Sequence, residues 1–573
     1  MRDFRDKRRS GLLLIGALSL LLPAMAGAQS PGQAPGPPIP LIPPSAGTPG
    51  AGEPAEAPNV PGNSPASGIP AEPLAPLAPG WAGDTTPPGN PLPRNFWQGT
   101  PRALADTLLA RLPDTTSPAL QGIVRRLLLS PAAAPTGPDA VGVSGGLPML
   151  RAALLLRLGE IEAARTVIAA VPERERAAAL PVLVEADAIG GHIDDACGKV
   201  SEAIRRNQAS LWQRALIACQ IVHGDSDQAG LGLQVLADQN PEQKAGRDDP
   251  LIVAADALAG RAAPAIVEKL ERADPLLLYA LLAAKRRLAP AAVAKLRADL
   301  ALTLALNQQA PADTRLVAAE RAAACGALPT ERLRELYADL AGDVSARSGG
   351  GAVERARRYT AIAAATAPPE RLSRILAFAE GFPAGAAGRD LDGLLLAARV
   401  VAPALRDIAP EAALAGGAEA AARLLIAAGE YDRARRWVSI DPAGGPELLS
   451  ILALVAEPAG ASGESGRASR PVLLAMRAAL GGSIDAVEWS RMPSAAWTAP
   501  GPAAPPPAAW LDLTDAAAMP RLGEAILASV LVAAPQTGLS KDPIALYAAV
   551  KGLDRAGLGV DARRLAVEAA LGS

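Results

Sequence analysis

Hydrophobic residues recur at a helical spacing along most of the chain, and a glycine precedes several of these runs. The glycines that begin the clearest runs are Gly159, Gly191, Gly224, Gly429 and Gly557. An alanine stands five residues after each of them and another apolar residue nine residues after, and the first three glycines are 32 and 33 residues apart. Apolar residues at these intervals line one face of a helix, and a glycine supplies the left-handed turn that ends the preceding helix. The pattern therefore predicts repeated helical hairpins.

A helical hairpin of about 34 residues cannot bury its apolar face alone, so neighbouring copies must stack. The interval resembles the second half of a tetratricopeptide repeat, which has Gly, an aromatic or aliphatic residue two positions on, Ala five positions on and a large apolar residue nine positions on. The best matches are Gly159 with Ile161 and Ala164, and Gly429 with Tyr431 and Ala434. The resemblance is clearest over 150–245 and degenerate elsewhere. It implies an all-α fold, an α-solenoid of stacked tetratricopeptide-like hairpins.

The first 28 residues have the pattern of a cleavable secretory signal. An Arg- and Lys-rich start is followed by an apolar stretch of about a dozen residues, and small residues precede Gln29. These features predict cleavage between Ala28 and Gln29 and export to the bacterial periplasm. The alternative is a retained membrane anchor, which needs about 20 apolar residues, and Pro23 argues against it. We expect no integral membrane span after cleavage.

The composition of the chain divides it into segments. A tract rich in Pro, Gly and Ala over 29–93 offers no periodic apolar face, so we expect a disordered linker, with a docking ligand or a route across the envelope as alternatives. The helical pattern predicts a repeat solenoid over 94–455. A flexible loop is expected over 456–470, and a C-terminal helical segment over 471–573, interrupted by a Pro-rich insertion over 492–510.

Two of the three cysteines are placed symmetrically in one predicted hairpin. Cys197 lies eleven residues before the turn near Gln208, and Cys219 lies eleven residues after it. In an antiparallel hairpin the two thiols therefore stand at similar heights, and an exported protein folds where disulfides form. We predict a disulfide between them, with two buried apolar thiols as the alternative. Cys325 is expected to be a buried thiol at a helix end, with intermolecular pairing as the alternative.

The chain has two histidines, His192 and His223, at the open end of the same hairpin. Three aspartates near them, Asp194, Asp195 and Asp225, make a metal site imaginable. A cluster of exposed side chains at helix ends is the interpretation we favour, because a charged His is favoured near a helix C-terminus in any case. We therefore predict no metal site and no cofactor.

The sequence contains none of the motifs that carry common enzymatic chemistry: no GxSxG elbow, no HExxH, no phosphate-binding loop and no dinucleotide fingerprint. The predicted architecture resembles the helical superhelices of lytic transglycosylases. Their catalytic Glu is followed by Ser in a compact domain, whereas Glu464-Ser465 lies in a Gly- and Ser-rich loop here, a poor place for a general acid. The net charge of −2 provides no basic surface for nucleic acid.

These observations favour a non-enzymatic scaffold or adaptor that mediates protein-protein interactions in a bacterial envelope assembly. The alternative is a peptidoglycan-acting envelope enzyme, or an activator of one, with a helical superhelix. A chaperone groove is disfavoured because the chain has only six Met. Trp497 and Trp510 lie in the Pro-rich insertion, and because Trp is enriched at interaction hot spots we expect them to contact a partner.

Overall fold

The computed structural model describes residues 81, 85, 87, 89–138, 146–239, 246, 248–270, 273–342, 351–382, 390–441, 445–456, 471–484, 486, 490, 507–517 and 521–572. These residues belong to one compact unit, Pro73–Ser573. The predicted signal peptide, with Ala28 and Gln29, lies outside the described residues, as do residues 29–80 of the predicted linker.

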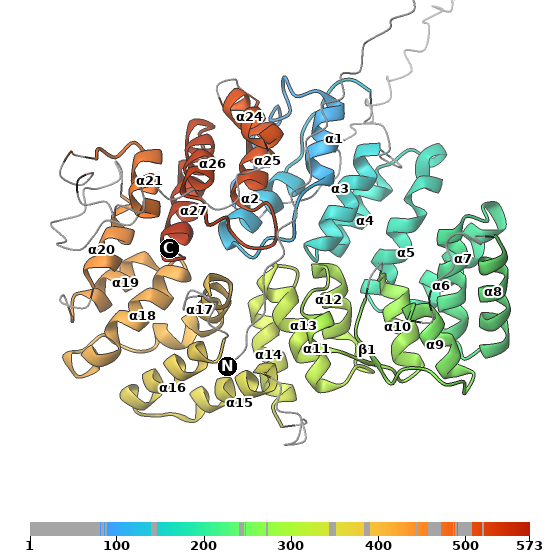
Figure 1. Ribbon diagram of the computed structural model, residues 1–573. Helices are drawn as coiled ribbons and strands as arrows, with labels where there is room; N and C mark the ends of the chain where they lie inside the picture. Colours follow the sequence, from blue (N-terminus) through green and yellow to red (C-terminus); the bar gives the residue numbers. More distant parts are fainter. Residues whose placement is uncertain are drawn as a thin grey trace, which may run out of the picture. The chain divides into compact units, whose positions relative to one another are not determined.

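The described part of the chain is mostly helical, as predicted (Figure 1). The first half contains α1 (Arg102–Ala110), α2 (Pro118–Leu129), α3 (Gly146–Arg157), α4 (Ile161–Ala169), α5 (Leu180–Ile189), α6 (Ile193–Arg206), α7 (Ser210–Val222), α8 (Ser226–Gln239), α9 (Pro250–Leu258), α10 (Pro275–Ala283), α11 (Pro290–Val293) and α12 (Ala298–Leu306). A short 3-10 helix, η1 (Glu173–Ala179), precedes α5.

The second half continues in the same way. It contains α13 (Ala312–Ala324), α14 (Thr330–Leu340), α15 (Gly351–Ala364), α16 (Pro368–Glu380), α17 (Leu391–Arg406), η3 (Ala412–Leu414), α18 (Ala415–Ala427), α19 (Tyr431–Val438), α20 (Pro446–Ala453), α21 (Pro471–Ala479), α24 (Pro507–Ala516), α25 (Leu522–Ala533), α26 (Pro543–Arg555) and α27 (Gly559–Leu571). Two loops of the first half form a two-residue parallel ladder, β1 (Ile266–Val267) with β2 (Arg287–Leu288), which the sequence pattern did not predict.

The glycines that begin the predicted repeats all lie at helix ends with left-handed backbone. Their φ angles are 75° at Gly159, 83° at Gly191, 84° at Gly224, 81° at Gly429 and 79° at Gly557. At Gly159 the next residue, Glu160, donates its N–H to the carbonyl of Leu155 at 2.9 Å. This bond closes the turn that a left-handed glycine allows at a helix C-terminus, so the prediction of a turn at each of these glycines is confirmed.

The alanines of the repeat pattern are the points of closest packing. Ala164, Ala196, Ala229, Ala434 and Ala562 are all fully buried. A small side chain at this position lets the two helices of a hairpin approach each other. Accordingly, helices that follow one another in sequence pack as pairs, for example α3 with α4, α5 with α6 and α18 with α19.

The two ends of the folded unit also contact each other. Helix α25 packs against α1 and α2, and α27 packs against α2, α18 and α20 (Figure 1). Two helices of the segment expected over 471–573, α25 and α27, therefore pack against the first described helices of the fold. Helix α12 likewise returns to contact α3 and α5.

Among the described residues, Trp81 already belongs to the core, ahead of the expected start at residue 94. The Trp81 side chain is fully buried, and its indole N–H donates to the carbonyl of Ser130 at 3.0 Å. The guanidinium of Arg151 lies 4.7 Å from the centre of the Trp81 ring and its Nε donates to the carbonyl of Leu128. The end of the Pro-rich tract is thus anchored by an aromatic ring and a cation–π contact.

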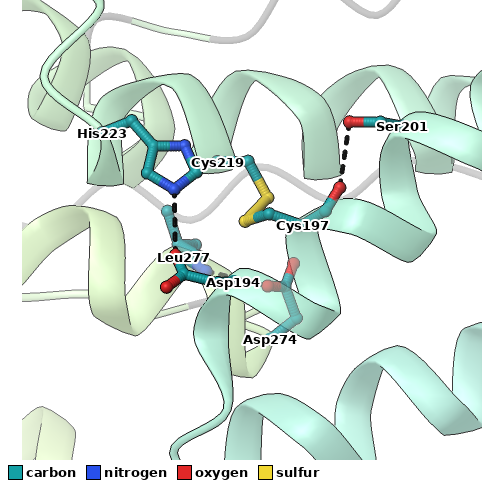
Figure 2. The surroundings of a disulfide bond; sticks show 7 residues. All are labelled: Asp194, Cys197, Ser201, Cys219, His223, Asp274 and Leu277. Carbon is teal, nitrogen blue, oxygen red and sulfur yellow. Dashed lines mark hydrogen bonds and ion pairs between the residues drawn. A yellow bond between two sulfur atoms is a disulfide. The ribbon is translucent and has the colours of Figure 1, made fainter.

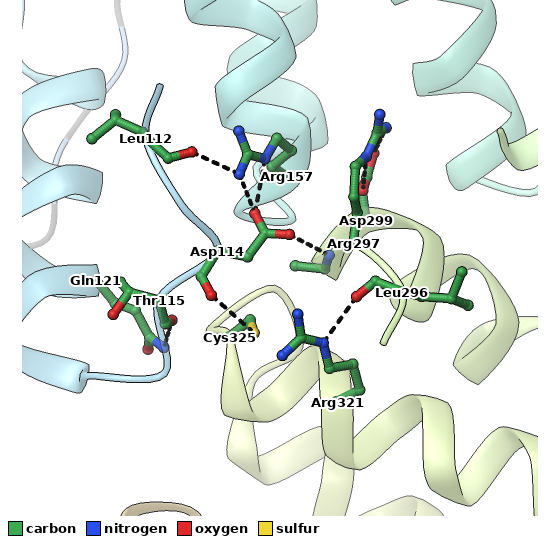
Figure 3. A network of polar contacts seen from close by, with 11 residues as sticks. Leu112, Asp114, Thr115, Gln121, Arg157, Leu296, Arg297, Asp299, Arg321 and Cys325 are labelled. Atoms are coloured by element: carbon green, nitrogen blue, oxygen red, sulfur yellow. Dashed lines mark hydrogen bonds and ion pairs between the residues drawn. The ribbon is translucent and has the colours of Figure 1, made fainter. Parts of the chain in front are cut away.

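Residues 112–121 run from the end of α1 into the first turn of α2 and contact several distant helices (Figure 3). We call them the junction segment. The Asp114 carboxylate accepts a hydrogen bond from Arg157 Nε at 2.8 Å and another from the backbone N–H of Ala298 at 3.1 Å. The Asp114 carbonyl lies 3.7 Å from the thiol of Cys325. One residue thus links the start of the fold to α3, α12 and α13.

The other half of the junction segment contacts the C-terminal helices. Thr116 Oγ1 donates to the carboxylate of Asp392 at 2.6 Å. The Glu568 carboxylate accepts hydrogen bonds from the hydroxyl of Ser117 and, at 2.8 Å, from the N–H of Ala119. Burial raises the pKa of Glu568 to about 7, although these hydrogen bonds favour its charged form. Buried polar contacts therefore hold α17 and α27 to the N-terminus of α2.

Candidate functional site

The predicted disulfide is present between Cys197 and Cys219, whose Cα atoms are 5.7 Å apart (Figure 2). It joins α6 to α7, and both cysteines are buried. The eleven-residue symmetry about the turn therefore identified the pair correctly. Cys325, at the end of α13, is a buried free thiol. Burial raises the pKa of Cys325 to about 11, so the thiolate that would be needed for pairing is disfavoured.

The histidines lie at helix ends beside this disulfide. His223 follows α7, and its Nε2 is 3.3 Å from an Asp194 carboxylate oxygen in an exposed pair (Figure 2). His192 precedes α6 at the turn after α5. Within the described ranges, no three His, Cys, Asp or Glu side chains are grouped so that they could hold a metal ion.

A pocket lies between α5, α7 and the start of α10. Glu185, Trp212 and Asp274 line it, and its cavity volume is about 50 Å³. The remaining lining residues are apolar: Pro181, Val184, Ala188, Leu211, Ala215, Pro275 and Leu276. We call it the carboxylate pocket. Two carboxyl groups in an otherwise apolar pocket are the arrangement that shifts acid pKa values upward.

The electrostatics of the carboxylate pocket agree with this expectation. Burial raises the pKa of Glu185 to about 7. The guanidinium of Arg297 opposes this rise, whereas the carboxylates of Asp299 and Asp274 add to it. Burial also raises the pKa of Asp274, although its carboxylate caps α10 by accepting the N–H of Leu277 at 2.9 Å. Both acids are thus biased toward their neutral forms.

Neither of these acids was expected to be a site residue from the sequence. Asp274 is followed by Pro275, a pair typical of a helix start, and this signal indicates a cap rather than a pocket. Glu185 carries no local signal, because its burial depends on α7 and α10 packing against α5.

A wider groove lies between α14, α15, α16 and α17, and we call it the α14–α17 groove. Its volume is about 570 Å³. Tyr359, Ile362, Ala338, Ala363 and Ala404 provide its apolar surface, and Thr360, Glu331, Arg334, Glu335 and Arg371 are its polar lining. The Tyr359 ring is held from behind by Tyr337 and Phe378, at centroid distances of 5.5 and 5.9 Å. The aromatic wall of the groove is therefore rigidly supported.

The charged side chains of the groove are already paired with one another or with neighbours. Arg334 lies 3.0 Å from Glu331, and Arg371 lies 3.2 Å from Asp407. Glu335 pairs with Arg332 at 2.6 Å. An occupant therefore meets apolar surface without a strong net charge.

The tryptophans expected to contact a partner are placed only in part. Trp510 lies in α24, which begins at Pro507, and it is half-buried against the core. The Pro-rich insertion therefore ends in a helix, earlier than the boundary expected at residue 510. Trp497 and the pair Glu464-Ser465 lie outside the described residues. The contact with a partner stays a prediction.

No helix in the described ranges is long and apolar enough to cross a lipid bilayer. Comparisons of the chain with protein-family models, with curated proteins and with solved structures find no significant match.

Proposed function

We propose that this chain is a non-enzymatic scaffold or adaptor of the bacterial periplasm, an α-solenoid of tetratricopeptide-like hairpins that binds other envelope proteins. The observation that supports this proposal best is the α14–α17 groove. It has the size of a ligand site, it is formed by consecutive hairpins, and its apolar wall is held in place by an aromatic cluster.

The chemistry of the groove favours a segment of protein as its occupant. Its apolar surface combines an aromatic ring with small alanines, and the paired charges at its edge leave the centre free for apolar side chains. The exposed alanines Ala338 and Ala363 leave room for a partner's side chain to enter. Apolar anchors surrounded by a polar rim are typical of protein interfaces.

Export is supported by two independent features. The pattern of residues 1–28 is that of a secretory signal. The disulfide between Cys197 and Cys219 suits an oxidising compartment, because cytosolic thiols are kept reduced.

The alternative, an enzyme or activator acting on peptidoglycan, is favoured by one observation. Glu185 is a partly buried carboxylic acid with a pKa raised to about 7, as a general acid requires. Its cavity of about 50 Å³ is much smaller than the sites that hold ligands of sugar size, so we place this function second. Release of soluble fragments from purified peptidoglycan by the wild type, lost in Glu185→Gln, would establish it instead.

The scaffold proposal is tested by filling the groove. The full chain carrying a C-terminal tag is crosslinked in living cells, and copurifying envelope proteins are identified by mass spectrometry. Ala338→Arg should reduce the recovery of a reproducible partner about tenfold, the effect expected when a contact near an interface centre is lost. Ala420→Arg, at an exposed site on α18 outside the groove, is the matched control and should leave recovery unchanged.

Two results would count against the proposal. Recovery of the protein alone would rule out a stable scaffold. Equal recovery from Ala338→Arg and the wild type would move the contact elsewhere, and deletion of 492–510 would then test the expected role of Trp497 and Trp510.

A further inference from the structure

Helix α24 is held to the rest of the fold by a small apolar face. Its buried residues are Ala509, Leu513 and Ala516. Leu513 packs directly on Gly552 of α26, where an added methyl group would lie 2.6 Å from its Cδ1 atom. The helix packs mainly against α25 and to a lesser extent against α26. Because this apolar face is small, a polar contact between α24 and α25 has a large share in keeping α24 in place.

The two helices meet at a pair of carboxyl groups, Asp512 of α24 and Glu524 of α25. Glu524 is fully buried. Neither of its carboxyl oxygens, nor the buried Oδ2 of Asp512, has a hydrogen-bond donor within the described part of the chain. An ionised carboxylate can only accept, so two ionised groups in this position cannot bond to each other. A single proton between them turns the same contact into a hydrogen bond.

The surrounding charges do not neutralise this pair. Arg521, at the start of α25, lies 2.7 Å from Glu524 Oε1 and also forms an ion pair with Asp515. Its positive charge acts on Asp512 as well. One guanidinium therefore faces three carboxyl groups. A buried site with such an excess of negative charge takes up either a proton or another cation.

The other elements around the pair change this balance little. Helix α1 packs against α25, and its Arg102 and Asp106 pair with each other at 3.4 Å. The buried hydroxyl of Thr100, just before α1, favours the charged form of Glu524. Burial nevertheless raises the pKa of Asp512, and burial together with the Asp512 contact raises the pKa of Glu524 to about 7.

We infer that Asp512 and Glu524 form a proton-dependent latch, in which one shared proton holds α24 against α25 and its loss releases α24. Glu524 is the donor and Asp512 the acceptor, because the bond favours the neutral form of Glu524 and the charged form of Asp512. Opening would expose Trp510, which is half-buried on α24. The latch does not depend on the proposed scaffold function, since neither acid lines the α14–α17 groove.

The sign of the pH dependence follows from the pKa of Glu524, which is about 7 in the closed form against an ordinary value of 4.5. Between these values the closed form holds one proton more than the open form. A rise in pH through this window therefore favours opening, and the effect levels off above about pH 7. The equilibrium constant for local opening of α24 should increase about fortyfold between pH 5 and pH 7.

The experiment is hydrogen exchange of the full chain, followed by mass spectrometry at pH 5, pH 6 and pH 7 and corrected for the intrinsic pH dependence of amide exchange. Protection of residues 507–516 should fall about fortyfold over this range. Protection of α13, which contacts neither helix of the latch, should stay nearly constant.

Two variants supply a permanent donor in place of the proton. Glu524→Gln keeps the shape of the neutral acid, and its amide can donate to Asp512 at every pH. Asp512→Asn provides the donor from the other helix. Each variant should keep α24 protected at pH 7 nearly as well as at pH 5. Glu185→Gln is the matched control, because it removes another glutamate with a pKa raised to about 7, on α5 and outside the latch, and it should show the wild-type fall.

Three results would overturn the inference. The first is protection of α24 that does not change with pH in the wild type, or that changes equally in α13. The second is a full pH dependence in both Glu524→Gln and Asp512→Asn. The third is recovery of protection at pH 7 on adding sodium or calcium chloride but not tetramethylammonium chloride, which would place a metal ion between the acids. Should Glu524→Gln change the far-ultraviolet circular dichroism, Asp512→Asn and the wild-type pH dependence decide the question.

Discussion

Cys197 and Cys219 are joined across 22 residues of chain, whereas Ala119 and Glu568 meet across 449. The first contact lies in a hairpin whose next helix, α8, buries one described side chain, Ala229, and leaves Leu231 and Val235 exposed. The second lies in the junction segment, where the side chains are surrounded by several helices. A hairpin next to the sparsely buried helix α8 is therefore joined by a covalent bond, and α2 is joined to α27 by buried polar contacts.

The difference follows from what each kind of bond can do. A disulfide limits the freedom of a short stretch wherever that stretch lies. Hydrogen bonds between buried groups are strong only where packing excludes water, and they are costly when one partner is lost. The junction segment should therefore be the more sensitive region to single substitutions, and the disulfide hairpin the more sensitive one to reducing agents.

The largest effect is expected from Asp114→Ala in the junction segment. The substitution leaves Arg157 without its carboxylate and the N–H of Ala298 without its acceptor. Breaking a mostly buried ion pair on one side should lower the free energy of unfolding by about 4 kcal/mol, measured by urea unfolding followed by circular dichroism. Asp432→Ala is the control: that side chain is 95% exposed and pairs with Arg435, so its loss should cost below about 0.5 kcal/mol. Similar effects for both variants would remove the contrast between a buried junction and an exposed surface.

A smaller and more local effect is expected when both disulfide cysteines are replaced by alanine. Loss of the cross-link should destabilise the hairpin by roughly 3 kcal/mol. Hydrogen exchange should become faster in α6, α7 and α8 and remain unchanged in α2 and α27. Equal acceleration in α2 would show that the two regions unfold as one. Thiol titration of the unfolded wild type gives an independent check, with one reactive thiol before reduction and three after it.

The smallest effect is the response of the two regions to pH. Glu568, which contacts the junction segment, and Glu185, beside the hairpin, each have a folded-state pKa raised to about 7 from an ordinary value of 4.5. Between these values the folded state holds more protons than the unfolded state, so stability falls as pH rises from about 4.5 to about 7 and levels off above.

Each of the two acids should contribute about 1 kcal/mol per pH unit to this fall. Glu568→Gln and Glu185→Gln should each flatten the dependence of the melting temperature on pH over that window. A stability that rises between pH 5 and pH 7, or a slope that neither variant reduces, would contradict the assignment. Glu524, whose pKa burial also raises to about 7, should account for part of the remaining slope.

The features that the sequence predicted are those encoded over short distances. The geometry of one hairpin determines each of them: the glycine at the turn, the alanine five positions later and the pairing of two cysteines eleven residues from the turn. The contacts of Asp114 and Glu568 depend on helices that lie far away along the chain, and no local pattern reports them. Glu185 is similar, since it resembles any helical glutamate until α7 and α10 cover it.

At Trp81 the predicted boundary between linker and folded unit was wrong for a different reason. The Pro-rich composition around it predicted a linker, and composition averaged over a window hides a single anchoring residue. An isolated tryptophan in a tract with few other large apolar residues was the available signal. Its burial beside Arg151 makes it part of the core of the folded unit.

The contact between Ser117 and Glu568 also has a consequence for the order in which the protein can fold. These residues are 451 positions apart, and Glu568 lies in α27. Synthesis of a chain proceeds from its N-terminus, so α2 must wait for α27 before this contact can form. Hairpins with local contacts should form early, and closure of the fold should be the late, slow step. Loss of α27 would leave Ser117 and Ala119 without the carboxylate that accepts their hydrogen bonds.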